Sequence, residues 1–360
     1  MRINFFNLRF VHAYQYPTKL LFGQSKNISY LFVRASHIMM LFEKEKEWRI
    51  GMSQYKSGVL FTVVGALLWG VSGTSGQFLL QHRGLTSGWL VAVRMLMAGL
   101  ILLVLCYKKE EGAIFRVWKD KRDRLDMFLF AALGLSFCQY TYFATISHSN
   151  AGTATVLQFL APVLIMVYLS FKNSRLPRPA EMTAIIFAVA GIFLLATHGR
   201  FDSLSTSKEA LTYGLLSAVA VVIYNLQPVR LIKTYGTLLS LGWGMLIGGI
   251  LLSIMYQPWR IIGTWDIAAF ASLLVIILFG TVISFSLYLE GVQRIGATVG
   301  SLLSSAEPLS ATFLSVVWLG TSLHWTDLVG IVLILSTVFL LTLKTKPIKA
   351  SEIIQTEPNI

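Results

Sequence analysis

The sequence predicts an all-α integral membrane protein with ten transmembrane helices in two inverted five-helix repeats. Three observations predict this fold: the composition, ten apolar runs of membrane-spanning length, and a repeated pattern of polar and proline positions. Of the 360 residues, 55% are hydrophobic and only 13% are charged, and the mean hydropathy is +0.67. Soluble domains carry about 25% charged residues. This chain therefore has too little polar surface to cover a globule in water.

The formal net charge of +13 does not indicate a nucleic-acid partner. Nucleic-acid-binding proteins gather basic residues on one face or stripe, whereas here they lie in short gaps between apolar runs. The excess is better interpreted as an orientation signal for a membrane protein. The two cysteines, Cys106 and Cys138, both fall inside apolar runs, so we expect them to be packing residues rather than a disulfide.

Ten runs are long enough to cross a bilayer, which takes about 20 helical residues. Their interiors are almost free of charge. The predicted spans are 58–80, 89–106, 127–146, 152–171 and 180–197 in the first half, and 210–229, 238–256, 268–289, 297–318 and 327–343 in the second.

Lys and Arg alternate between the two sets of connecting loops. Sixteen lie on one side of the predicted spans and four on the other. Because cytoplasmic loops carry the excess of Lys and Arg, the first side is predicted to be cytoplasmic. Both termini lie on that side, and the expected location is the cytoplasmic membrane of a cell.

The predicted organisation has five parts: an N-terminal tail (1–56), a first repeat (57–197), a Ser/Thr-rich linker (198–209), a second repeat (210–345) and a C-terminal tail (346–360). Residues 1–51 differ from the rest, and Met52 opens an ordinary cytoplasmic start. Lys46-Glu47-Trp48 can be encoded by a purine-rich ribosome-binding core. We interpret residues 1–51 as lying upstream of the true translation start. The alternative is a genuine tail, disordered or on the membrane surface.

The two halves resemble each other at a constant offset of 146 residues. The gapless matches are Tyr142 with Tyr288, Ala151 with Ala297, Leu157 with Leu303, Pro162 with Pro308 and Glu181 with Asp327. In the second spans, Met95, Leu96 and Gly99 match Met245, Leu246 and Gly249. Five helices is an odd number, so the second copy starts on the opposite membrane face. The repeat is therefore inverted, an architecture that lets a central site open to either side.

These features resemble the drug/metabolite transporter superfamily, specifically its EamA-type permeases, over about residues 57–345. The resemblance is carried by Gly65-Ala66-Leu67-Leu68-Trp69-Gly70, by Arg94, by Ala161-Pro162 and by Glu307-Pro308. It implies secondary transport of a small metabolite by alternating access: an amino acid, a related metabolite or a small drug-like cation. Two acids often found in that family are missing, one near Gly320-Thr321 and one near residues 172–174. No role of those acids can be carried over.

Glu307 is the sharpest candidate site residue because it lies near the middle of a predicted span. An acid at that depth costs a few kcal/mol unless it faces the bundle interior. It is expected to couple transport to protons or to bind a substrate amine. The alternative is a structural hydrogen bond beside a kink at Pro308. Arg94 is the candidate counter-charge for Glu307. It would pair with Glu307, bind an anionic substrate group, or reach the outer head groups with its long side chain.

Three further polar candidates lie beside prolines. Gln158 precedes Pro162, and Asn225 and Gln227 precede Pro228. They would bind substrate or satisfy backbone carbonyls that a proline leaves free. Pro162 and Pro308 are helix-break candidates in corresponding spans, a pattern that indicates a binding site.

Four aromatic residues would line a cavity or form the belt at the membrane interface: Trp69, Tyr142, Tyr224 and Tyr288. For Tyr288, near the end of its span, we expect the interfacial belt. Gly65 and Gly73, with Ser72, are expected to serve close helix packing.

The sequence contains no phosphate-binding loop, no metal-ligand spacing, no nucleophile motif and no pair of catalytic acids. We therefore expect no cofactor and no metal, and no enzymatic activity. The expected partners are a small-molecule substrate and the lipid bilayer, with proton coupling and a homodimer left open. The alternatives to a carrier are a non-transporting receptor or assembly protein and an intramembrane enzyme.

Overall fold

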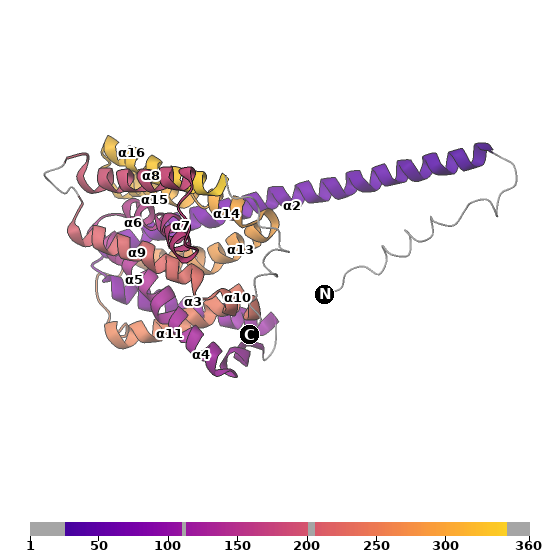
Figure 1. Cartoon of the computed structure of the whole chain (residues 1–360). Helices are drawn as coiled ribbons and strands as arrows, with labels where there is room; N and C mark the ends of the chain where they lie inside the picture. Colours follow the sequence, from indigo (N-terminus) through magenta and orange to yellow (C-terminus); the bar gives the residue numbers. More distant parts are fainter. Residues whose placement is uncertain (1–25, 110–112, 201–205, 344–360) are drawn as a thin grey trace. The chain divides into compact units, whose positions relative to one another are not determined.

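The computed structural model describes residues 26–109, 113–200 and 206–343 (Figure 1). The predicted C-terminal tail, residues 1–25 and the middle of the predicted linker lie outside these ranges. The chain divides into two compact units, residues 1–56 and 57–360. Helix α2 (Lys26–His82) begins in the first unit and ends in the second. The translation start at Met52 stays a prediction.

Every regular element in the described residues of the second unit is helical. Nine of its helical segments, kinked ones included, are long and apolar enough to span a membrane, and Trp325–Leu341 is a shorter apolar helix. All ten predicted runs overlap these segments. The all-helical membrane fold is confirmed, whereas the exact number of ten spans stays a prediction. The elements after α2 are α3 (Ser87–Lys109), η2 (Ala113–Trp118), α4 (Lys121–Leu129), η3 (Phe130–Ser136), α5 (Phe137–His148), α6 (Ala151–Gln158), α7 (Ala161–Lys172), α8 (Pro179–Thr197), α9 (Lys208–Leu226), α10 (Val229–Tyr235), α11 (Thr237–Tyr256), α12 (Ile267–Leu274), η4 (Val275–Ile283), α13 (Ser284–Ile295), α14 (Ala297–Leu303), α15 (Ala306–Leu319) and α16 (Trp325–Leu343).

Corresponding spans of the two repeats are interrupted in the same way. The third and eighth spans each contain a π-helical stretch, η3 and η4, at positions related by the offset of 146. In both stretches a hydroxyl donates to a carbonyl five residues earlier: Ser136 to Ala131 at 2.7 Å, and Thr281 to Ile276 at 2.9 Å. Wide turns of this kind inside α-helices occur frequently at functional sites.

The fourth and ninth spans are broken rather than widened. The fourth span is divided into α6 and α7, and the ninth into α14 and α15, with each break just before the proline that the repeat relates. Proline has no N–H to donate and its ring excludes the carbonyl of the preceding turn. Pro162 and Pro308 therefore lie within the first turn of α7 and of α15 respectively, where the missing N–H costs nothing.

Helix packing follows the symmetry of an inverted repeat. The two second spans, α3 and α11, pack against each other, and so do the two fifth spans, α8 and α16, on the opposite side of the unit (Figure 1). Across the repeats, α3 also packs on η4, and α11 packs on η3. The second span of each repeat therefore packs on the third span of the other repeat, as a two-fold relation between the repeats requires.

Two glycines allow α3 and α11 to cross closely. A Cβ atom on Gly99 would lie 2.5 Å from the backbone nitrogen of Leu246, and one on Gly249 would lie 2.6 Å from that of Leu96. These contacts exchange under the repeat. Small residues at such a crossing let two membrane helices bring their backbones together.

Ion pairs join the connections at both ends of the bundle. At one end Arg83 reaches Asp266, with Nη2 2.7 Å from Oδ2, and Asp266 also caps α12 through the Ala269 N–H. The hydrogen bond from Arg83 is the main reason that the pKa of Asp266 lies below its usual value. At the other end Arg230 pairs with Asp123 and with Asp126.

Candidate functional site

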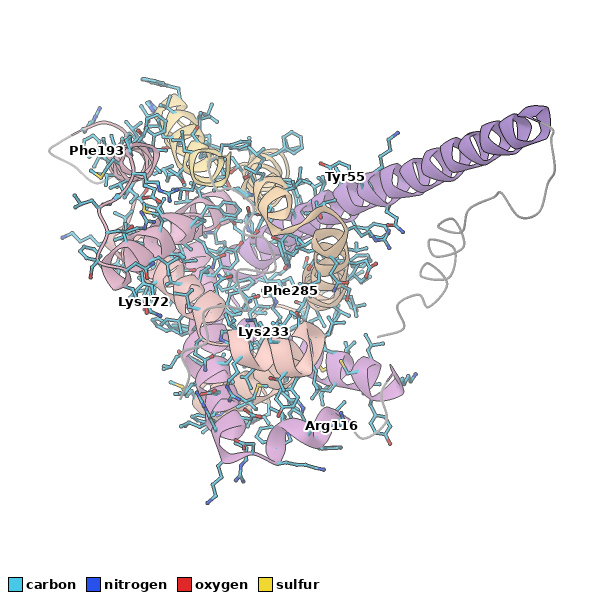
Figure 2. The ribbon with its side chains drawn as sticks, turned by 45° about the vertical axis from the view of Figure 1, so that its right-hand side comes forward. Tyr55, Arg116, Lys172, Phe193, Lys233 and Phe285 are labelled. Carbon is cyan, nitrogen blue, oxygen red and sulfur yellow. The ribbon has the colours of Figure 1, made fainter. Side chains whose placement is uncertain are left out.

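A cavity of about 300 Å³ lies inside the second unit, between the two repeats. Its walls combine an acid, a guanidinium group, amides, hydroxyls and aromatic rings. Figure 2 labels Phe285 of α13, one of the lining residues. Its lining residues include Trp69, Ser72, Gly73, Arg94, Cys138, Gln139, Tyr142, Gln158, Pro162, Tyr224, Asn225, Thr237, Phe285, Tyr288, Leu289, Ser301, Ser304 and Glu307.

Glu307 reaches the cavity from the break in the ninth span. It lies in the first turn of α15, whose N-terminal end carries partial positive charge and favours a carboxylate. Within the described residues its carboxyl group has no hydrogen-bond partner, and only its backbone groups bond, to Ser304 and Ser310. The expected alternative of a structural side-chain hydrogen bond is thus not what the structure contains.

Arg94 is held by the protein rather than by Glu307. Its Nε donates to Thr281 Oγ1 at 2.9 Å, its Nη1 to Gln139 Oε1 at 2.9 Å and its Nη2 to the Gly280 carbonyl at 3.2 Å. The side chain is buried, so the expectation that it extends to the outer head groups is wrong. No direct ion pair with Glu307 occurs in the part of the chain that the structure describes.

Replacing Arg94 by lysine is expected to destabilise the protein. Lysine cannot reproduce three donors spread over a planar fork, and a hydrogen bond from a charged group contributes about 1.5–3 kcal/mol. We expect a lower melting temperature in detergent for Arg94→Lys. The matched control is Arg83→Lys, whose arginine is partly exposed at the end of the bundle. Equal melting temperatures of the two variants would contradict the structural role of the Arg94 fork.

Aromatic rings form one wall of the cavity. The ring of Trp69 lies 5.0 Å from that of Phe285 and 4.9 Å from that of Tyr288. Tyr142, the counterpart of Tyr288 in the first repeat, is anchored by a hydrogen bond of 2.9 Å between its hydroxyl and Thr155 Oγ1. Tyr288 was expected in the interfacial belt, and that expectation is wrong. It faces the cavity because a span that continues to Ile295 places Tyr288 two turns inside the helix end.

The remaining candidates divide between the cavity and other places. Gln158, Asn225 and Pro162 line the cavity, whereas Gln227 and Pro308 are not among its lining residues. Gln158 donates to Ser217 at 2.7 Å, and Asn225 donates to the Val221 carbonyl at 2.7 Å. Gln227 donates instead to the Asp126 carbonyl at 2.9 Å. A functional role for each of these residues stays a prediction.

Several lining residues were not predicted from the sequence. Gln139 was not predicted as a lining residue because it has no neighbouring proline and no match in the repeat. An amide within a predicted span is nevertheless a sequence signal for a polar site. Ser72 and Gly73 were assigned to packing alone. Both line the cavity, and the buried Ser72 Oγ has no hydrogen-bond partner among the described residues. The signal that could have found them is their place one turn after Trp69.

The described lining residues extend to one end of the bundle. They include Thr237, the first residue of α11, together with Leu289 in the second half of α13 and Ser301 in α14. Lys172 and Lys233, labelled in Figure 2, lie at connections on this same predicted cytoplasmic side. Towards the other end, the lining stops at Gly73 and Tyr142.

Comparisons with known proteins identify relatives along the second unit. The chain is 39% identical over 299 residues to the uncharacterized inner membrane transporter YicL of Salmonella typhimurium, which covers 82% of this chain and 98% of that one. It is 23% identical to the threonine/homoserine exporter RhtA of Escherichia coli, over 64% of this chain and 74% of that one. A solved crystal structure with 17% identity matches with a TM-score of 0.54, covering 80% of this chain and 97% of that one, which supports the fold.

The model of the EamA-like transporter family matches residues 56–197 and 208–343, one match for each five-helix repeat. The two matches together cover most of the chain. They agree with the helix breaks, π-helical stretches and glycine crossings that the two halves share. This chain is a member of the EamA-like transporter family, a multi-pass membrane transporter of a small molecule.

Proposed function

We propose that this chain is a secondary carrier that moves a small molecule bearing a cationic amine by alternating access, in exchange for a proton on Glu307. The observation that carries the proposal is the Glu307 carboxyl group, which lines a cavity between the repeats without a hydrogen-bond partner in the described structure. A proton and an ammonium group are the two partners that such a carboxylate binds best.

The aromatic wall favours an amine over an anion. The faces of Trp69 and Tyr288 carry negative electrostatic potential, and an ammonium group near them gains about 0.5–2 kcal/mol. Arg94, the one cation among the described lining residues, already donates to Thr281, Gln139 and Gly280. A carboxylate would have to share those donors. The supported substrate class is therefore an amino acid, a related metabolite or a small organic cation.

Alternating access follows from the inverted repeat. A protein built from two oppositely oriented copies has two conformations of similar energy, and each opens the central site to a different side. In the present conformation the cavity reaches the end that the loop charges predict to be cytoplasmic. One chain supplies both repeats and the whole cavity, so the proposal needs no second copy. A receptor or an enzyme has no comparable need for a symmetric pair of breaks.

The experiment uses purified protein in liposomes that contain a pH-sensitive dye. Threonine, homoserine and tetramethylammonium are added in turn under an imposed pH gradient. The amino acids are chosen because RhtA is named as their exporter. We expect at least one of these amines to drive dye-reported proton movement in the opposite direction, with no movement in empty liposomes. Amine uptake without any proton movement would refute the exchange, and proton leakage independent of every amine would refute the carrier.

A further inference from the structure

Gln77 makes a four-way connection above the closed end of the cavity. Its side chain is 2% exposed. Its Oε1 accepts from the Ala151 N–H at 2.9 Å and from Ser315 Oγ at 2.9 Å. Its Nε2 donates to Gln81 Oε1 at 3.1 Å and to Thr321 Oγ1 at 3.1 Å. One amide from the first span thus ties down the start of the fourth span and the end of the ninth.

Gln81, one turn further along α2, extends this connection to the third span. Its Nε2 donates to the carbonyls of Ile146 at 3.0 Å and Ser149 at 2.7 Å. The cavity-lining residues Gly73 and Tyr142 precede Gln77 and Ile146 by four residues each, which is about one helical turn nearer the membrane centre. The end of the bundle that carries Gln77 is therefore bridged by polar contacts among four spans, beside buried apolar residues such as Phe143. Hydrogen bonds of this kind can be exchanged between two conformations.

A second glutamine in the bundle, Gln227, is bonded differently. Gln227 lies just beyond α9, at the end where the cavity opens. Its Nε2 donates to the Asp126 carbonyl, but its buried Oε1 has no hydrogen-bond partner among the described residues. The glutamine at the closed end is fully bonded, and the one at the open end is half bonded.

The donor that Gln77 binds lies at the start of a helix. Gln77 accepts from the N–H of Ala151, the first residue of α6. A first-turn N–H has no partner inside its own helix. We infer that Gln77 is a latch: its four hydrogen bonds hold the cavity shut at one end in this conformation and break when that end opens.

This inference rests on the proposed alternating access and names a residue that sets its balance. Its test uses Cys138, which lines the cavity, as a reporter in a Cys106→Ala background that leaves one thiol. A membrane-impermeant cationic methanethiosulfonate is added to one face of oriented vesicles at a time. In the parent protein the thiol is expected to react mainly from the face where the cavity opens. Reaction at equal rates from both faces in the parent would refute alternating access itself.

Gln77→Leu removes the hydrogen bonds at nearly constant volume. Because the lost bonds stabilise only the closed end, we expect the reaction rate of Cys138 from that end to rise by about tenfold or more. Gln227→Leu is the matched control, because Gln227 bonds to the Asp126 carbonyl at the other end of the bundle, and it should leave that rate unchanged. A sided parent whose labelling is unchanged by Gln77→Leu would overturn the latch and leave the carrier intact.

A milder variant guards against misfolding of Gln77→Leu. Ser315→Ala removes one of the four hydrogen bonds and should raise the labelling rate from the closed end by a smaller factor, in the same direction. Melting temperatures in detergent establish that each variant is folded. If Ser315→Ala is folded and shifts labelling towards the open end instead, the assignment of Gln77 as the latch is wrong.

Discussion

Glu307→Gln is expected to abolish amine-driven proton movement in liposomes. Glutamine keeps the size and polarity of the side chain but can neither take up a proton near neutral pH nor carry the charge that an ammonium group requires. Removing one partner of a buried charge pair costs about 2 kcal/mol or more, roughly a 30-fold loss of affinity. Both the affinity for the amine and the coupled proton flux should fall in the pH-dye assay.

The matched control for this variant is Glu290→Gln. Glu290 lies on α13 near the end of the bundle, where it pairs with Arg294 at 2.7 Å and is half exposed. It is not among the residues that line the cavity. Proton movement should be retained in this control. Coupled transport by Glu307→Gln at the parental rate would mean that another group carries the proton.

Gly99→Ala is expected to cause the largest loss of stability. In an unobstructed helix, alanine is about 1 kcal/mol more favourable than glycine. Here the added methyl group would lie 2.5 Å from the Leu246 nitrogen and 2.8 Å from its Cα, and backbone atoms cannot move aside as a flexible side chain can. Overpacking of this kind costs about 1–3 kcal/mol and sometimes more. The helices α3 and α11 would have to separate, which lowers the melting temperature in detergent.

The repeat supplies a second site and a control for this measurement. Gly249→Ala should lower the melting temperature by a similar amount, since its methyl group would meet the Leu96 nitrogen at 2.6 Å. Leu100→Ala, next to Gly99 but half exposed on the outer surface of the unit, should change it much less. If both glycine variants melt above the parent, helix propensity outweighs the crossing and the close packing of α3 on α11 is not required.

The fold could be predicted from the sequence for two reasons. The thickness of the bilayer sets the length of a spanning helix, and the two repeats match at proline and glycine positions, which are uncommon in helices. Pro162 and Pro308 marked the two helix breaks. The repeat also matched Gly99 with Gly249, and the structure places this pair at the crossing of α3 and α11. The π-helical stretches could not be predicted in this way. They depend on hydroxyls such as Ser136 bonding a carbonyl five residues back, and a serine within an apolar run predicts no such register.

The site was only partly predictable for a similar reason. An intramembrane acid such as Glu307 is easily recognised in the sequence because a charge in lipid costs much free energy. The hydrogen-bond partners of Arg94 could not be predicted, since Thr281 and the Gly280 carbonyl come from a widened turn in the other repeat. Gln77 was overlooked near the end of a span, where an amide has no cost. Its importance appears only once four spans meet around it.

The most direct test of the account is whether the cavity is the transport path. Cys138 is modified with a bulky cationic methanethiosulfonate in the Cys106→Ala protein, and amine-driven proton movement is then measured in liposomes. Because Cys138 lines a cavity of about 300 Å³ that also contains Glu307, the account predicts that modification stops transport and that reduction of the mixed disulfide restores it. Full transport by quantitatively modified protein would contradict the account, since the substrate would then pass elsewhere.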